Sequence, residues 1–175
     1  MPFHELSARI RFREVPIEEV QLLEFRNAYE AWDALPKSSQ ACPQWPGIEF
    51  ILRLPPSLAA DTMVMSYSGD LAKAKYVYWG SGLRWSSPFD MTGKNPFEYT
   101  SPDLRQFIEH TLYPVIDAKA PRFYYAEFTG AAGVRYPEHV LRLPFFGENN
   151  DLAYILTIIS IMDRREMSKI FDNMI

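Results

Sequence analysis

The second half of the chain contains three segments whose apolar positions favour β-strands. In Arg122 to Thr129 aromatic side chains occupy both alternating sets, and in Glu138 to Phe145 apolar residues recur at every second position. Leu152 to Ile161 is apolar on both faces, which is typical of a strand inside a sheet. Glycine-containing turns at 130–133 and 147–151 separate the three segments. Because these turns are short, we expect three antiparallel neighbours.

Two shorter strands are expected in the first half of the chain, and three helices are expected along the whole of it. Strands are expected at Thr62 to Tyr67 and Lys75 to Trp79, with a turn between them. A helix is expected from about Pro16 to Leu35, because proline suits the first helical position. A second helix is expected to start after the N-cap residue Ser101 and to reach Ala118, and a closing helix is expected within 163–175.

This order predicts an α+β protein with a five-stranded antiparallel sheet. The first two strands must join the sheet beside the last strand, which therefore lies in its middle. Helices of the middle connection would cover one face of the sheet, with the N- and C-terminal helices added to that core. We expect an N-terminal segment and helix at 1–35, a domain at 36–162 and a C-terminal helix at 163–175.

Composition and charge exclude several classes of protein. The 175 residues are 47% hydrophobic and 23% charged, which is ordinary globular usage and excludes a disordered chain or a coiled coil. The net charge of −4 argues against a nucleic-acid binder, which needs a basic face. No basic cluster suits a membrane surface, and the longest apolar stretch is about half of the ~20 residues that a bilayer span requires. We expect a cytoplasmic protein.

Few residues have the context that cofactor or metal chemistry needs. Cys42 is the single cysteine, so an intrachain disulfide and a cysteine-based zinc cluster are excluded. The histidines His4, His110 and His139 lack metal-ligand spacing, and we expect no metal or other cofactor. The helical pattern directs His110 away from the core, which argues against a haem ligand there.

Four short motifs point to one family. The leading helix carries Tyr29-Glu30-Ala31-Trp32, the strand at 75–79 continues into Gly80-Ser81-Gly82-Leu83, and a D-x-T-G turn follows at Asp90-Met91-Thr92-Gly93. The fourth motif is a later strand that ends in Leu143-Pro144. With the strand order, these motifs resemble PAS domains, and most closely the stand-alone PAS proteins common in alphaproteobacteria, over residues 29–162.

The resemblance implies a bacterial sensory or regulatory module with no chemistry of its own. In a PAS fold the sheet and the middle helices enclose a pocket for a small organic ligand. The side chains that these elements would contribute are Trp79, Arg84, Trp85, Phe97, Tyr99, Phe107 and Tyr124. Arg84 could pair with a ligand carboxylate. The same rings could instead fill the core, with Arg84 at the surface. Signal transduction would use a partner protein, reached through the N-terminal helix or residues 167–174, and we expect a homodimer.

Two other functions fit the same sequence. A small cone-fold lyase or isomerase could use Asp90, Glu127, Glu138 or His139 for acid–base catalysis in a ring-lined cavity. A purely structural interaction module, with no ligand, is the third hypothesis. A bound ligand would separate the first two hypotheses from the third, and turnover would separate the enzyme from the sensor.

Overall fold

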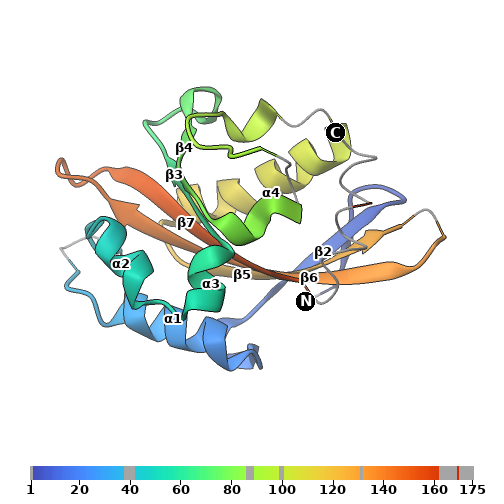
Figure 1. Ribbon diagram of the computed structural model, residues 1–175, viewed down its shortest axis with the longest axis horizontal. Coiled ribbons are helices and arrows are strands. Elements are labelled where there is room, and N and C mark those ends of the chain that lie inside the picture. Colours follow the sequence, from blue (N-terminus) through green and yellow to red (C-terminus); the bar gives the residue numbers. More distant parts are fainter. Residues whose placement is uncertain are drawn as a thin grey trace.

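A seven-stranded antiparallel sheet forms the centre of the molecule (Figure 1). The computed structural model describes residues 2–37, 42–85, 89–98, 101–130, 132–161 and 169, without the side chains of Arg84 and Trp85. The strands follow the order β1-β2-β5-β6-β7-β3-β4 across the sheet. Their bounds are β1 (His4–Glu5), β2 (Ile10–Val15), β3 (Thr62–Ser66), β4 (Lys75–Trp79), β5 (Arg122–Thr129), β6 (Arg135–Phe146) and β7 (Leu152–Ile161).

The five predicted strands are confirmed, and so is the position of the last one. Strand β7 lies between β6 and β3, and it pairs antiparallel with both. Its neighbouring residues Ile155 and Leu156 belong to the apolar clusters on opposite faces of the sheet, and both are fully buried. This explains why the segment is apolar on both faces. The order β5-β6-β7-β3-β4 makes the fold PAS-like.

The sheet has two more strands than the sequence predicted. Strand β2 pairs antiparallel with β5, with Ile10 opposite Phe128, and β1 pairs with β2. In β2 the buried residues Ile10 and Phe12 alternate with the half-buried Arg11 and Arg13. The period-two pattern was therefore present, but it lies in a segment expected to precede the sheet. The N-terminal residues instead extend the sheet beyond β5.

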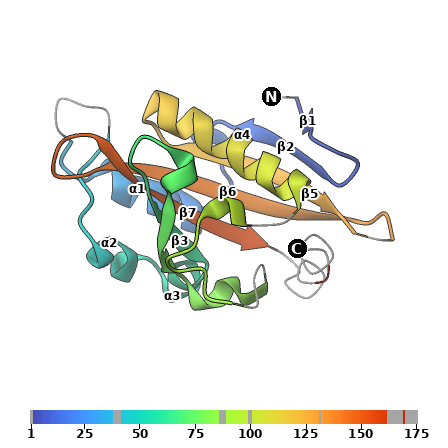
Figure 2. The same cartoon turned by 90° about the horizontal axis from the view of Figure 1, so that it is seen from above.

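Helix α4 (Pro102–Ala118) covers one face of the sheet, as the sequence predicted. Its N-cap is Ser101, whose hydroxyl accepts a hydrogen bond from the Leu104 amide at 3.3 Å. The helix continues through Pro114 and ends at Lys119, which has the left-handed φ of 49°. Figure 2, seen from above, shows α4 lying over the sheet. Short helical turns η2 (Leu71–Lys73), η3 (Ser81–Trp85) and η4 (Pro96–Glu98) belong to the connections around it.

The opposite face is covered by α1 (Leu23–Asp33), α2 (Ile48–Arg53) and α3 (Pro56–Ala60) (Figure 1). The expected helix at 16–35 is in fact a 3-10 turn, η1 (Ile17–Glu19), followed by α1. Between them Val20 has an extended backbone, and its side chain is buried. The apolar side chains of this segment would cover too wide an arc for a single amphipathic helix. The break allows Val20 to pack into the core independently of α1.

The connection between the sheet and α1 is fixed by a buried hydrogen bond. The indole Nε1 of Trp32 donates to the carbonyl oxygen of Pro144 at 2.8 Å.

None of the described helices is long and apolar enough to cross a membrane. The expected C-terminal helix at 163–175, including the contact residues at 167–174, lies outside the described residues apart from residue 169.

Candidate functional site

The predicted ligand-binding residues that the structure describes lie on the side of the sheet that α4 covers, although three strands separate β4 from β5. Trp79, Phe107 and Tyr124 belong to one buried cluster, and the half-buried Phe97 packs against it. Phe107 comes from α4, whereas Trp79 and Tyr124 come from the strands β4 and β5. Tyr99 and the side chains of Arg84 and Trp85 lie outside the described residues.

A buried arginine lies at the centre of this face. Arg142 of β6 is 6% exposed and lies opposite Thr157 of β7. Its guanidinium donates to the Thr157 hydroxyl at 2.9 Å and to the Thr111 hydroxyl of α4 at 2.7 Å. The same row of paired residues continues through Met63 to Trp79. Residues paired directly across strands face the same side. Arg142 therefore connects the helix to the sheet beside the predicted ring cluster.

Five polar atoms of this face have no hydrogen-bond partner among the described residues. They are Nε of Arg142, Nε of Arg122, the hydroxyl of Tyr124, Nε1 of Trp79 and Oε2 of Glu138. The first four can donate a hydrogen bond. Since a buried polar group without a partner costs stability, each of these donors favours an acceptor close to it. We call Arg142, Tyr124, Trp79 and Glu138 the α4-side polar cluster.

Burial controls the protonation of this cluster. It raises the pKa of Tyr124 to about 12, so the phenol keeps its proton. It also raises the pKa of Glu138 to about 8, although the positive charge of Arg142 opposes this. Glu138 and Arg142 are four residues apart on one strand and so face the same side. At neutral pH Glu138 is mainly a neutral acid, and the guanidinium is the dominant charge of the cluster.

The sequence indicated Arg142 only indirectly. The Leu-Arg-Leu-Pro segment contributed to the family resemblance through its apolar residues and its proline. However, Leu141 and Leu143 face the α1–α3 side and are fully buried. Their alternation places Arg142 on the other face of a strand that is buried on both sides. A charge at such a position is rare, and this was the signal that could have identified it.

The four groups considered for acid–base catalysis do not form one site. Glu127 forms an ion pair with Arg11 at 2.7 Å and lies 3.5 Å from Arg135. Glu138 and His139 are neighbours on β6 and therefore face opposite sides of the sheet.

The remaining carboxylate of that set, Asp90, has a structural role in the D-x-T-G turn. Its Oδ1 accepts a hydrogen bond from the Thr92 amide at 2.8 Å, and hydrogen bonding to Thr92 lowers the pKa of this carboxyl. Gly93 has a φ of +82°, which favours glycine. Its amide donates to the Tyr76 carbonyl at 2.7 Å, and the Tyr76 amide donates to the Lys94 carbonyl at 2.9 Å. The turn thus binds the outer edge of β4.

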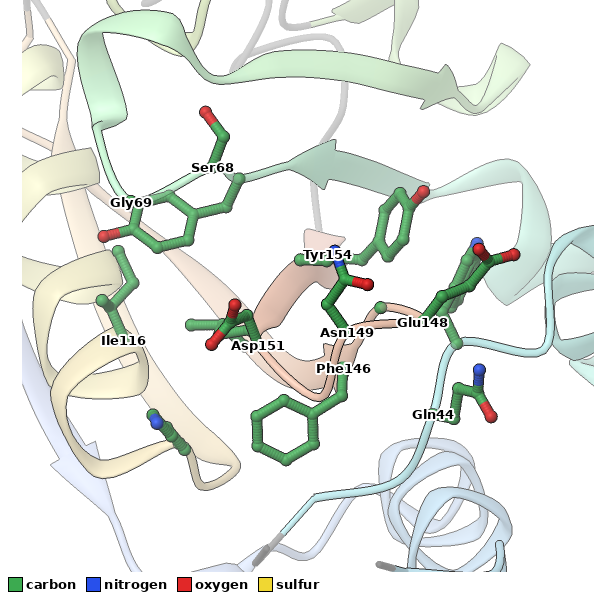
Figure 3. Close-up of a pocket in the computed structure, with 15 residues that line it drawn as sticks. Gln44, Ser68, Gly69, Ile116, Phe146, Glu148, Asn149, Asp151 and Tyr154 are labelled. Atoms are coloured by element: carbon green, nitrogen blue, oxygen red, sulfur yellow. The ribbon is translucent and has the colours of Figure 1, made fainter.

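A surface pocket lies at the other end of the sheet, where the β6–β7 turn approaches the turn after β3 (Figure 3). It has a volume of about 850 Å³. None of the seven predicted ligand-binding residues lines it. Its walls come from four segments that are far apart in the sequence, namely residues 44–45, 67–69, 116 with 119, and 146–149 with 151–154.

Comparison with known proteins adds similarities only at the level of structure. No family model matches the chain, and no curated protein matches it. The PAS domain of a Colwellia psychrerythraea protein is 14% identical, with a TM-score of 0.44, over 62% of this chain and 95% of that one. The photo-excited blue-light photoreceptor Vivid is 12% identical, with a TM-score of 0.46, over 81% and 95%. An RNA-binding light-oxygen-voltage receptor is 9% identical, with a TM-score of 0.48, over 95% and 42%. The PAS-like description of the fold rests on its strand order.

Proposed function

We propose that this chain is a sensory or regulatory module that binds a small organic molecule between α4 and the sheet. The buried Arg142 carries this proposal. Its charge lies within the described core, with Nε lacking a hydrogen-bond partner there. A guanidinium binds carboxylates with matching geometry. The ligand would therefore carry a carboxylate or a similar acceptor group.

The other residues of the predicted pocket supply the rest of the recognition. Trp79 and Tyr124 offer additional donors, and the ring of Phe107 offers an apolar wall. Arg84, Trp85, Phe97 and Tyr99 remain proposed ligand-binding residues. Small-molecule sites usually combine aromatic and apolar side chains with a few precisely positioned polar groups.

The contacts of Arg142 also supply a route for a signal. Its hydrogen bond to Thr111 is a direct polar link between the sheet and α4. A ligand that competes for the guanidinium changes the energy of this link, so it favours one position of α4 over another. Because the acid–base candidates do not converge, we propose a binding module and not an enzyme. Its output would pass to a partner protein, and we propose a cytoplasmic homodimer as the working form.

Native mass spectrometry of freshly purified protein tests the proposal. We expect a co-purified small molecule on the wild type, and its loss in Arg142→Met. The control is Arg135→Met, which removes an exposed guanidinium on the opposite face of the same strand, where it lies 3.5 Å from Glu127. Thr111→Val provides a second test, because it removes only one hydroxyl partner of Arg142.

Folding is monitored separately, because Arg142 is buried. Far-ultraviolet circular dichroism and urea unfolding identify variants that are simply unfolded. If a folded Arg142→Met keeps the ligand at the wild-type level, the guanidinium does not bind it. If folded wild type neither co-purifies with a small molecule nor binds one in a screen of carboxylates, the interaction-module hypothesis is favoured.

A further inference from the structure

The surface pocket at the β6–β7 turn combines aromatic walls with charges of both signs. Trp45 and Tyr154 form part of its wall, and their ring centroids lie 5.5 Å apart at a tilt of 31°. Both rings are half-buried, so each contributes some accessible surface. The volume of about 850 Å³ is within the usual range for small-molecule sites.

The positive charge comes from the end of α4. Lys119 lines the pocket, and its Nζ lies 5.7 Å from the centroid of the Phe146 ring. No carboxylate of the described residues lies within ion-pair distance of this ammonium. The lysine is therefore a cation that is held on an aromatic ring but has no anionic partner in that part of the chain.

The negative charges come from the β6–β7 turn. Glu148 and Asp151 are exposed, and neither has an ion-pair partner among the residues the structure describes. The turn is closed by a hydrogen bond from the Gly147 amide to the Asp151 carbonyl at 2.9 Å, and both acidic residues line the pocket. Figure 3 shows Glu148 on one side and Ile116 of α4 on the other, with Asp151 between them.

We infer that this pocket binds a small zwitterion of the amino-acid or short-peptide type. The ligand's ammonium group pairs with a carboxylate of the β6–β7 turn, Glu148 or Asp151, and contacts the rings beside it, which favour a cation over their faces. The ligand's carboxylate pairs with Lys119. An apolar body between the two charges packs against Trp45, Tyr154 and Phe146.

The charge pattern distinguishes this ligand from simpler ones. A simple anion would meet Lys119 but also two carboxylates. An organic cation would meet the carboxylates but also the lysine. A metal ion is disfavoured, since the described residues contain no group of three or more potential metal-binding side chains. Only a ligand with both charges pairs with every charged group of the pocket. The site lies apart from Arg142, so it stands independently of the function proposed above.

Four forms of one dipeptide test the inference by isothermal titration calorimetry. The probes are glycyl-phenylalanine, its N-acetyl form, its C-terminal amide and the form blocked at both ends. We expect the free dipeptide to bind most tightly. Blocking one end should weaken binding roughly two- to fivefold, which is the effect of an exposed ion pair. High salt should reduce the difference.

Two variants assign each end of the ligand to its partner. In Lys119→Met we expect amidation of the carboxylate to have no further effect, while acetylation still weakens binding. In the double variant Glu148→Gln/Asp151→Asn we expect the reverse. Lys75→Met and Glu19→Gln remove exposed charges elsewhere and should leave all four affinities unchanged. Equal affinity for the four forms, or no binding of the free dipeptide at millimolar concentration, would show that the inference is wrong.

Discussion

The stability of the fold should decrease as the pH rises through the neutral range, and Glu138 should be responsible. This side chain is 2% exposed, and burial raises its pKa to about 8 from an ordinary value of 4.5. Below about pH 4.5 the carboxyl is protonated in both the folded and the unfolded chain. Between these two values the unfolded chain loses this proton while the folded chain keeps it. Stability is therefore highest below the lower value and is lost as the pH rises towards the upper one.

The magnitude follows from the two pKa values. They differ by about 3.5, and each unit corresponds to 1.36 kcal/mol, so ionisation of Glu138 lowers the free energy of unfolding by about 5 kcal/mol. That is comparable to the whole stability of a marginal domain. Arg142 limits the effect, because its charge favours the ionised carboxylate.

Urea unfolding between about pH 5 and pH 9 measures this effect when wild type is compared with Glu138→Gln. We expect the free energy of unfolding of the wild type to fall by several kcal/mol more than that of the variant across this range. Glu19→Gln, which changes an exposed glutamate in η1, should follow the wild type. If the curves of wild type and Glu138→Gln remain parallel over the whole range, Glu138 is not the group that titrates.

Two further substitutions and one chemical reaction test the packing of the fold. Trp32→Phe leaves the Pro144 carbonyl without its 2.8 Å donor, and we expect urea unfolding to show a loss of about 1–3 kcal/mol. Gly80→Ala would place a Cβ 2.2 Å from the carbonyl oxygen of Ala60, so we expect a loss of about 1–3 kcal/mol, and an unchanged melting temperature would contradict this contact. Burial raises the pKa of Cys42 to about 12, so an aromatic disulfide reagent should react with it only as fast as the fold opens. Rapid reaction in native buffer would show that the thiol is accessible.

The local periodicity of apolar residues was sufficient to predict most of the strands of the sheet. The bounds of β4, β5 and β7 agree with the sequence, because their alternation or continuous apolar character is strong over the whole strand. The break at Val20, between η1 and α1, was not predictable from periodicity. Whether this segment forms one helix or two helical pieces depends on the surface of the sheet against which it packs. Strand β2 was missed although its residues alternate, because its partner strand β5 is distant in the sequence and no local pattern shows that pairing.

The sequence predicted part of the proposed site under α4 but none of the pocket beside the β6–β7 turn. The ring cluster under α4 was predicted from the family resemblance; Trp79, Phe107 and Tyr124 belong to the buried cluster on that face, and their role in ligand binding stays a prediction. Arg142 was missed, because its partners Thr111 and Thr157 come from distant segments. The pocket beside the β6–β7 turn depends on four separate segments, and no local pattern connects Trp45 or Lys119 to Glu148.

The arrangement of the outer strands restricts how this protein can associate with others. An open strand edge is a template for a further strand and a risk for aggregation. At one edge the last strand, β1, has only two residues. At the other, the amide and carbonyl of Tyr76 in β4 are occupied by Lys94 and Gly93 of the D-x-T-G turn. Both features reduce polymerisation through the sheet and capture of a partner as an added strand. They favour recruitment of another chain through side chains on the helices and sheet faces.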